Sequence, residues 1–263
     1  MSNTVLTKRK EGVLTITMNR PEALNALDRE LSETLQKTIV TAEQDKKVRC
    51  VVIRGGEQFM AGGDLKYFAE NFGINPNEKR IMFEGFINQV HKIIISIRHM
   101  PKPVVASIRG PAAGFGLSLA MACDLAIASD DAFFTLAYVN IGTSPDGGST
   151  FALPRILGDK KAAEIAFLGD RFSAAAAKEF GIVNWVVAGT DLETETSNLA
   201  KRLAEGPTTA IGRTKALLQQ SLNTTLENQL LAEAASFSSC AVEPDFDEGI
   251  SAFIAKRKPK FKG

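Results

Sequence analysis

The sequence predicts an α/β protein that ends in a region built of helices only. Short apolar segments rich in β-branched residues alternate with longer helical segments over residues 5–187. Glycine-rich turns follow two of the apolar segments, at residues 61–64 and 110–114. Beyond these segments the spacing of apolar residues is helical to the end of the chain. We therefore expect an α/β core over residues 1–190 and a helical region over residues 191–263.

The first element is a predicted β-hairpin, because alternating segments flank the turn at Glu11 and Gly12. Asp28 and Ser173 have the side chains of helix N-caps, and each precedes a helical segment. A long helix is expected to end shortly before Pro101, because proline stops helices. Strands are expected over residues 5–9, 13–18, 50–53, 104–107, 125–128, 133–135 and 183–187, and core helices over residues 29–45, 79–98, 115–123, from 149 and after 173. The C-terminal helices are expected to break at Gly206-Pro207, Asn223-Thr224 and Pro244.

Composition argues against several classes of protein. The formal net charge of +1 provides no basic surface for nucleic acid or for an anionic membrane. No apolar run is long enough to span a membrane, since Arg98 and Lys102 interrupt the longest one. The N-terminal residues lack the apolar segment of a signal peptide. Cys50, Cys123 and Cys240 do not have the spacing of metal ligands, so we expect buried free thiols, no metal site and a cytoplasmic location.

The two glycine turns have the properties of a site for an anionic oxygen. Each turn follows a strand, and the second turn leads into the helix that begins at Phe115. The N-terminus of a helix presents free backbone N–H groups, and glycine lets a ligand approach the backbone closely. The two turns can therefore supply one N–H each to a single carbonyl oxygen.

The usual catalytic motifs are absent, and the sequence has no HExxH, CxxC, GxxxxGK[ST] or GxSxG pattern. His91 and His99 lie on the long helix or just after it without a nearby acid pair, so we interpret both as surface or packing residues. Asp124 is expected to have a structural hydrogen bond, and Asp64 to brace its turn. Asp146 lies in a glycine-rich loop before a helix, where it is either the helix N-cap or a general base that faces the two turns.

In this order and spacing, the segments resemble the enoyl-CoA hydratase/isomerase (crotonase) superfamily over essentially the whole chain. In local motifs the chain is most similar to the isomerase of phenylacetyl-CoA degradation. The matching segments are residues 19–27, 59–65, 102–124, 145–148, 153–155 and 249–261. The resemblance implies a spiral of ββα units that holds an acyl-CoA site. It also implies that the C-terminal helices drive assembly into a homotrimer or a dimer of trimers.

The resemblance further implies a role for individual residues. The N–H groups of Gly63 and Phe115 would hold the thioester oxygen of an acyl-CoA, and Asp146 would be the acid/base. Residues 68–84 would line the acyl pocket. CoA would be part of the substrate, so no other cofactor is required. The remaining residues that the resemblance assigns to CoA or substrate binding are Ala23, Leu24, Ala26, Ala61, Gly62, Asp64, Leu65, Gly114, Tyr138, Phe253 and Lys256, the last two from a neighbouring subunit.

Two positions depart from the pattern of the hydratases. Their catalytic glutamates fall on Ser118 and Tyr138, and neither side chain is a carboxylate base near neutral pH. Asp146, in contrast, coincides with the aspartate of relatives that move double bonds. An isomerase needs one base that removes a proton and returns it at another carbon. We therefore predict an isomerase that converts 3-enoyl-CoA to 2-enoyl-CoA.

Three alternatives stay open at this point. The first is a hydratase of low or altered activity that uses Asp146 and a water molecule. The second is a CoA-thioester dehalogenase or hydrolase with Asp146 as nucleophile, although the histidine that assists in the dehalogenases falls on Ile87. The third is an acyl-CoA-binding protein without catalytic activity. The sequence does not specify the acyl group or the pathway.

Overall fold

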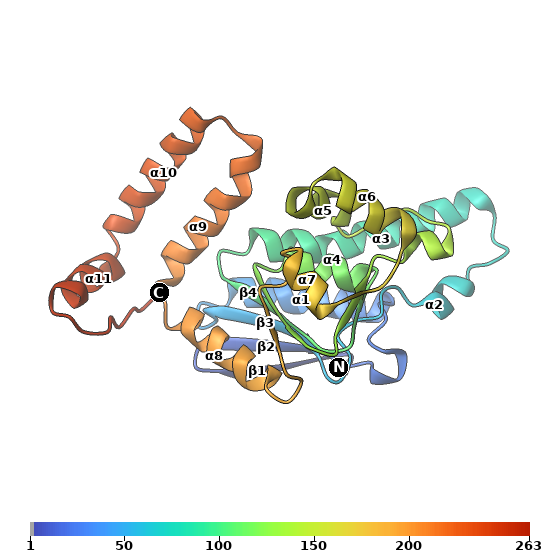
Figure 1. Cartoon of the computed structure of the whole chain (residues 1–263), viewed down its shortest axis with the longest axis horizontal. Coiled ribbons are helices and arrows are strands. Elements are labelled where there is room, and N and C mark those ends of the chain that lie inside the picture. The colour runs from blue at the N-terminus through green and yellow to red at the C-terminus, as the bar shows by residue number, and fades with distance from the viewer. Residues whose placement is uncertain (1–2) are drawn as a thin grey trace.

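A computed structural model describes residues 3–263 as a sheet-based core with a helical extension (Figure 1). The main sheet has the strand order β1-β2-β3-β4-β6-β9, in which β1 and β2 form an antiparallel hairpin and the following pairs are parallel. A smaller sheet has the order β5-β7-β8. The strands are β1 Val5–Lys10, β2 Val13–Met18, β3 Cys50–Gly55, β4 Val104–Ile108, β5 Pro111–Ala113, β6 Leu125–Ser129, β7 Phe133–Thr135, β8 Phe172–Ser173 and β9 Trp185–Val187.

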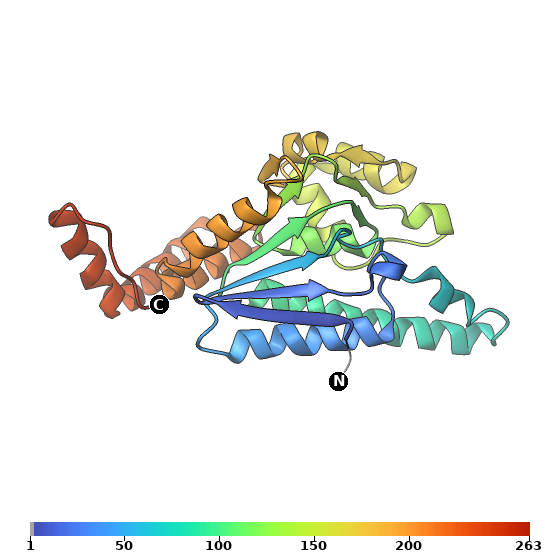
Figure 2. The same cartoon turned by 90° about the horizontal axis from the view of Figure 1, so that it is seen from below.

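Helices cover both faces of the main sheet (Figure 2). Val51 and Ile53 point into the larger hydrophobic core, which contains the apolar side of α1 and α3. Cys50 and Val52 point the other way, into a smaller core beneath α8. The helices are α1 Arg29–Gln44, α2 Leu65–Ala69, α3 Pro76–His99, α4 Phe115–Ala122, α5 Ser149–Leu157, α6 Asp159–Leu168, α7 Ala174–Glu179, α8 Leu192–Ala204, α9 Thr208–Gln220, α10 Leu226–Ala241 and α11 Pro244–Ile254.

The helices α9, α10 and α11 extend away from the core (Figures 1 and 2). Lys215 on α9 joins the extension to the core: its Nζ lies 2.8 Å from Oδ2 of Asp124 and donates to the carbonyl of Ile97 at 2.7 Å. The extension leaves many large apolar side chains exposed, namely Leu218, Leu222, Leu226, Leu230, Leu231, Phe237, Ile250, Phe253 and Ile254.

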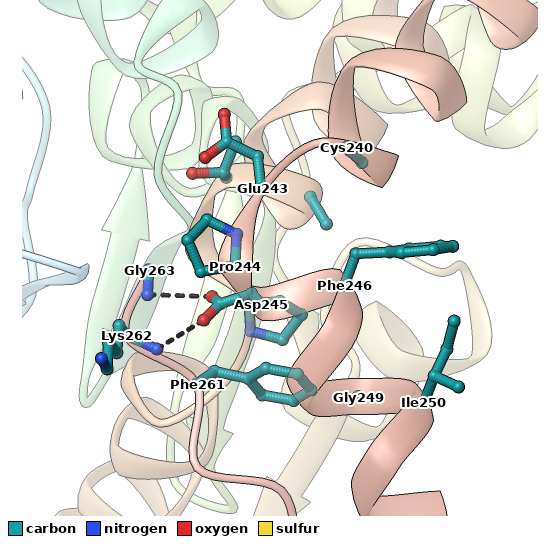
Figure 3. A pocket seen from close by; sticks show the side chains of 13 residues that line it. Cys240, Glu243, Pro244, Asp245, Phe246, Gly249, Ile250, Phe261, Lys262 and Gly263 are labelled. Carbon is teal, nitrogen blue, oxygen red and sulfur yellow. Dashed lines mark hydrogen bonds between the residues drawn. The ribbon is translucent and has the colours of Figure 1, made fainter.

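Where the extension begins, a pocket of about 330 Å³ lies between the start of α9, the end of α10, α11 and the C-terminal residues (Figure 3). Asp245 at the start of α11 accepts hydrogen bonds from the N–H groups of Lys262 (2.7 Å) and Gly263 (2.9 Å). Arg257 forms an ion pair with Glu248 at 2.7 Å. The C-terminal residues are therefore folded back against α11.

Most predicted elements are confirmed, including the hairpin and the cap residues. The Asp28 carboxylate accepts from the N–H of Leu31, and Ser173 Oγ accepts from the N–H of Ala176. The segment 111–113 was expected to be a turn, but it forms strand β5 because β7 lies beside it. The helices α2 and α6 and strand β8 were not predicted. Of the three thiols, Cys50 and Cys123 are buried as expected, whereas Cys240 is only half-buried.

Residues 3–263 contain no helix that is long and apolar enough to cross a membrane.

Candidate active site

The first glycine turn lies beside the loop at residues 20–27. The N–H of Leu27 donates to the carbonyl of Gly62 at 2.7 Å, and the N–H of Ala61 donates to the carbonyl of Leu24 at 3.0 Å. A third bond joins the N–H of Asp64 to the carbonyl of Leu27 at 3.0 Å. The structure therefore brings together the candidates that the sequence placed on these two segments, which are Ala23, Leu24, Ala26, Ala61, Gly62, Asp64 and Leu65.

Asp64 braces this turn, as predicted. Its carboxylate accepts hydrogen bonds from the N–H groups of Lys66 and Tyr67 and so caps helix α2. It also lies 3.1 Å from the guanidinium of Arg20. Burial alone would raise the pKa of Asp64, but the bonds from Tyr67 and Arg20 outweigh burial and leave the pKa below its ordinary value. The Asp64 carboxylate is therefore engaged in holding the turn.

The two glycine turns are in direct contact. The N–H of Met60 donates to the carbonyl of Pro111 at 2.9 Å, and the N–H of Ala113 donates to the carbonyl of Met60 at 3.0 Å. A Cβ atom placed on Gly114 would lie 3.6 Å from the Cα of Gly62. Backbones can approach this closely because neither residue carries a side chain. The segments that precede Gly63 and Phe115 thus run side by side.

The N–H groups of Gly63 and Phe115 have no acceptor within the part of the chain that the structure describes. Gly63 lies between the bonded residues Gly62 and Asp64, and Phe115 is the first residue of helix α4. At the first residue of a helix, the N–H has no partner within the helix and carries the positive end of the helix dipole. Both groups are therefore available to a ligand.

Asp146 is hydrogen-bonded to Tyr138. The Tyr138 hydroxyl donates to Oδ1 of Asp146 at 2.5 Å. Burial raises the pKa of Asp146, while the hydrogen bond from Tyr138 acts in the opposite direction. Burial also raises the pKa of Tyr138, so the phenol stays protonated and donates. Asp146 is therefore a carboxyl group with a raised pKa and a single strong side-chain donor.

The alternative interpretation of Asp146, as the N-cap of the following helix, is wrong. Helix α5 begins after Gly148, which has a left-handed backbone and no capping side chain. Only the main-chain carbonyl of Asp146 bonds to that helix, through Ser149. The carboxylate points to Tyr138 instead, because two glycines separate Asp146 from the helix and turn the backbone away.

The loop that carries Asp146 packs on the first turn of α4. A Cβ atom placed on Gly147 would lie 2.6 Å from Cβ of Ser118 and 2.9 Å from Cδ2 of Phe115. The Tyr138 ring lies 3.9 Å from the position that a Cβ on Gly114 would take. The loop of Asp146 and the Tyr138 ring thus lie against the second glycine turn and the helix that follows it.

His91 is half-buried and contacts this loop, so of the two roles expected for it, surface or packing, the structure shows packing. The N–H of Gly147 donates to Nε2 of His91 at 3.3 Å. His91 lies one helical turn before Ile94, whose side chain is 3.8 Å from a Cβ placed on Gly148. The sequence contains a further signal, because His91 lies one helical turn after Ile87, the position of the dehalogenase histidine. His99 is exposed, as expected.

An aromatic cluster lies against the first glycine turn. The ring of Phe68 is 2.7 Å from the position of a Cβ on Gly63. Its centroid is 5.3 Å from that of Phe83, and the Tyr67 and Phe86 rings are 5.6 Å apart. These side chains come from α2 and α3 and form an apolar wall next to the free N–H of Gly63.

Phe253 and Lys256 do not join the site within one chain. Phe253 is 86% exposed, and Lys256 is also exposed. They lie on α11 and just after it, at the opposite end of the molecule from α2 (Figures 1 and 2). Among residues 3–263 there is also no cluster of three or more side chains that could hold a metal ion.

This fold and this site define an enzyme of the enoyl-CoA hydratase/isomerase family, to which the chain belongs: residues 8–263 match that family. The chain is 34% identical to 1,2-epoxyphenylacetyl-CoA isomerase of Escherichia coli, with 100% of both chains covered. It is 30% identical to crotonyl-CoA hydratase of Syntrophomonas wolfei subsp. wolfei, over 98% of this chain and 97% of that protein. The crystal structure of an enoyl-CoA hydratase from Polaromonas sp. superposes with a TM-score of 0.92 at 34% identity, over 98% of this chain and 99% of the other. The relatives thus include both isomerases and hydratases.

Proposed function

We propose that the protein is an acyl-CoA double-bond isomerase that converts 3-enoyl-CoA to 2-enoyl-CoA. The observation that carries this proposal is the carboxyl group of Asp146, which has a raised pKa and lies in a loop that packs on the helix whose first N–H, that of Phe115, is free. The positions of the hydratase glutamates hold Ser118 and Tyr138, and both are engaged in holding Asp146 or its loop. A single base suits proton transfer between two carbons of one substrate.

In the proposed mechanism Asp146 removes a proton from the carbon next to the thioester carbonyl. The electrons move to the carbonyl oxygen, and the enolate accepts hydrogen bonds from the N–H groups of Gly63 and Phe115. One such donor is worth about 3–4 kcal/mol of barrier. Asp146 then returns the proton to the γ carbon, which places the double bond in conjugation with the carbonyl. No proton is gained or lost overall.

The test compares the wild type with Asp146→Asn, using the absorbance of the conjugated enoyl thioester after addition of a 3-enoyl-CoA. We expect the wild type to form this product and the variant to lose about two to four orders of magnitude in kcat, because the amide cannot accept the proton. Ser144→Ala, in the same loop but without a role in the mechanism, is the control. A wild type that hydrates 2-enoyl-CoA but leaves 3-enoyl-CoA unchanged is a hydratase. A wild type that binds CoA esters but converts neither substrate is a binding protein.

We further propose that the protein is a homotrimer, alone or as a pair of trimers, and that CoA binds as part of the substrate thioester. In support, α9, α10 and α11 expose many large apolar side chains. Helix α11, which carries Phe253, also lies at the opposite end of the molecule from α2, which lies against the first glycine turn (Figures 1 and 2). In a trimer Phe253 and Lys256 would meet the adenine and phosphates bound by a neighbour, while Ala23–Ala26 and Ala61–Leu65 contact the rest of CoA.

A further inference from the structure

The peptide unit between Asp146 and Gly147 is held by side chains on both of its edges. Its carbonyl accepts from Oγ of Ser118 at 3.0 Å and from Oγ of Ser149 at 2.9 Å. Its N–H donates to Nε2 of His91 at 3.3 Å. The three contacts come from α4, α5 and α3, so three separate helices meet at this one peptide.

The backbone around this peptide is conformationally free unless side chains restrain it. Gly147 and Gly148 are both left-handed, with φ of +61° and +77°. Consecutive glycines have the greatest backbone freedom in the unfolded and loosely folded chain. Without side-chain contacts, the direction of the Cα–Cβ bond of Asp146 would vary with rotation of the peptide that follows it.

The carbonyl and the N–H of this peptide differ in their number of hydrogen-bond partners. The carbonyl keeps its bond to Ser149 when Ser118 is removed, and the N–H of Ser149 is a further donor at 3.3 Å. For the N–H of Gly147, His91 is the only acceptor among the residues that the structure describes. An imidazole nitrogen accepts a hydrogen bond only through its lone pair, so Nε2 of His91 carries no proton in this contact.

We propose that His91 is a positioning residue, which together with Ser118 holds the Asp146–Gly147 peptide and thereby aims the carboxylate of Asp146. This proposal rests on the proposed function of Asp146 as the base. His91 contacts no reacting atom, and its effect is transmitted through the backbone. Ser118, at the position of a hydratase glutamate, takes a supporting role in the placement of a different carboxylate.

Loss of the His91 contact is expected to reduce turnover without reducing affinity. A displacement of the base by a fraction of an ångström slows proton transfer, and such misplacements reduce rates by up to about 100-fold. The free N–H groups of Gly63 and Phe115 and the CoA-binding segments do not contact His91, so the KM is expected to stay within about twofold. This split between kcat and KM separates positioning from a general loss of folding.

The experiment uses four variants and two measurements. His91→Leu removes the acceptor, His91→Gln restores an acceptor at a similar distance from the backbone, and Ser118→Ala removes the other contact. His99→Leu changes the other histidine, which is exposed at the end of the same helix. The measurements are kcat and KM for 3-enoyl-CoA, and hydrogen exchange of the Gly147 amide in the absence of ligand.

His91→Leu is expected to lower kcat by about 10- to 100-fold and to speed Gly147 exchange by about five- to tenfold. His91→Gln is expected to restore most of both values, Ser118→Ala to lower kcat less than His91→Leu does, and His99→Leu to match the wild type. Unchanged kcat in His91→Leu, or equal losses in His91→Leu and His91→Gln, would overturn the proposal. If the wild type turned over no enoyl-CoA, the proposed function would fail, and exchange of the Gly147 amide alone would test the role of His91. Faster exchange in His91→Leu would support the proposed hold of His91 on the Asp146–Gly147 peptide, and unchanged exchange would overturn it.

Discussion

The carboxyl group of Asp146 is subject to two opposing effects at the scale of a single residue. Burial disfavours its charged form and raises its pKa, while the hydrogen bond from Tyr138 favours the charged form. A base that must release its proton again benefits from a pKa nearer to neutrality than that of a free carboxylate. The balance between the two effects therefore bears directly on the rate.

Tyr138→Phe is expected to shift the pH dependence of the isomerase. Without the phenolic donor the pKa of Asp146 rises further, so a larger fraction of the base is protonated at low pH. A hydrogen bond to a charged group is worth about 1.5–3 kcal/mol, which corresponds to about one to two pH units. The acid limb of kcat/KM against pH should therefore move upward by about that amount.

Tyr67→Phe is the matched control for this prediction, because the other tyrosine of the chain lies in the aromatic cluster and has no bond to Asp146. Its acid limb should coincide with that of the wild type. If the limb of Tyr138→Phe did not move, a group other than Asp146 would control the profile.

At the scale of elements, one buried ion pair joins the helical extension to the core. The side chain of Lys215 is 7% exposed and that of Asp124 is 20% exposed. Asp124 also accepts from the N–H of Val104 at the start of β4, as the expected structural hydrogen bond of this residue. Burial raises the pKa of Asp124, and Lys215 opposes that rise. Asp124 thus bonds both to helix α9 and to the first residue of the central strand β4.

Lys215→Met is expected to lower the free energy of unfolding by about 3–5 kcal/mol, because it leaves Asp124 buried without its cation. The measurement is urea-induced unfolding at one fixed protein concentration. Lys201→Met is the matched control: Lys201 pairs with Glu11 and Glu205 at the surface, where such pairs contribute about 1 kcal/mol or less. Equal effects of the two substitutions would show that the buried pair has no special role.

At the scale of the whole molecule, the apolar surface of the helical extension would be unusual if the protein were a monomer. Large apolar side chains are exposed along α10 and α11, and extensive exposed apolar surface is typical of sites of protein association. The proposed trimer would cover this surface and complete the CoA site with Phe253 and Lys256. Assembly and substrate affinity are therefore expected to be linked.

Leu231→Glu tests that link, since Leu231 on α10 is 70% exposed. A charge at this position should disfavour burial in an interface, so the mass in solution should fall from that of a trimer toward that of one chain. The KM for the CoA ester should rise at the same time. Light scattering coupled to size exclusion measures the mass, with Leu6→Glu on the hairpin as control. A wild type with the mass of a single chain would contradict the proposed assembly.

The sequence predicted the elements whose causes are local, and it missed features that depend on distant partners. The hairpin at Glu11 and Gly12 and the cap at Asp28 are set by a few adjacent residues, and both were predicted correctly. The strand at 111–113 exists because β7 lies beside it, about 20 residues away along the chain. The contact of His91 was not predicted for the same reason, since its partner Gly147 is 56 residues away.

By itself, the sequence determined the family, the order of most elements and the identity of the candidate groups. These depend on residue types at short spacing and on the order of motifs, which are visible in one dimension. Tertiary structure alone decided that the two glycine turns touch, that Asp146 faces Tyr138 rather than capping a helix, and that His91 holds the neighbouring peptide. These contacts join residues that are far apart in the chain, so they arise only when the sheet and its helices pack together.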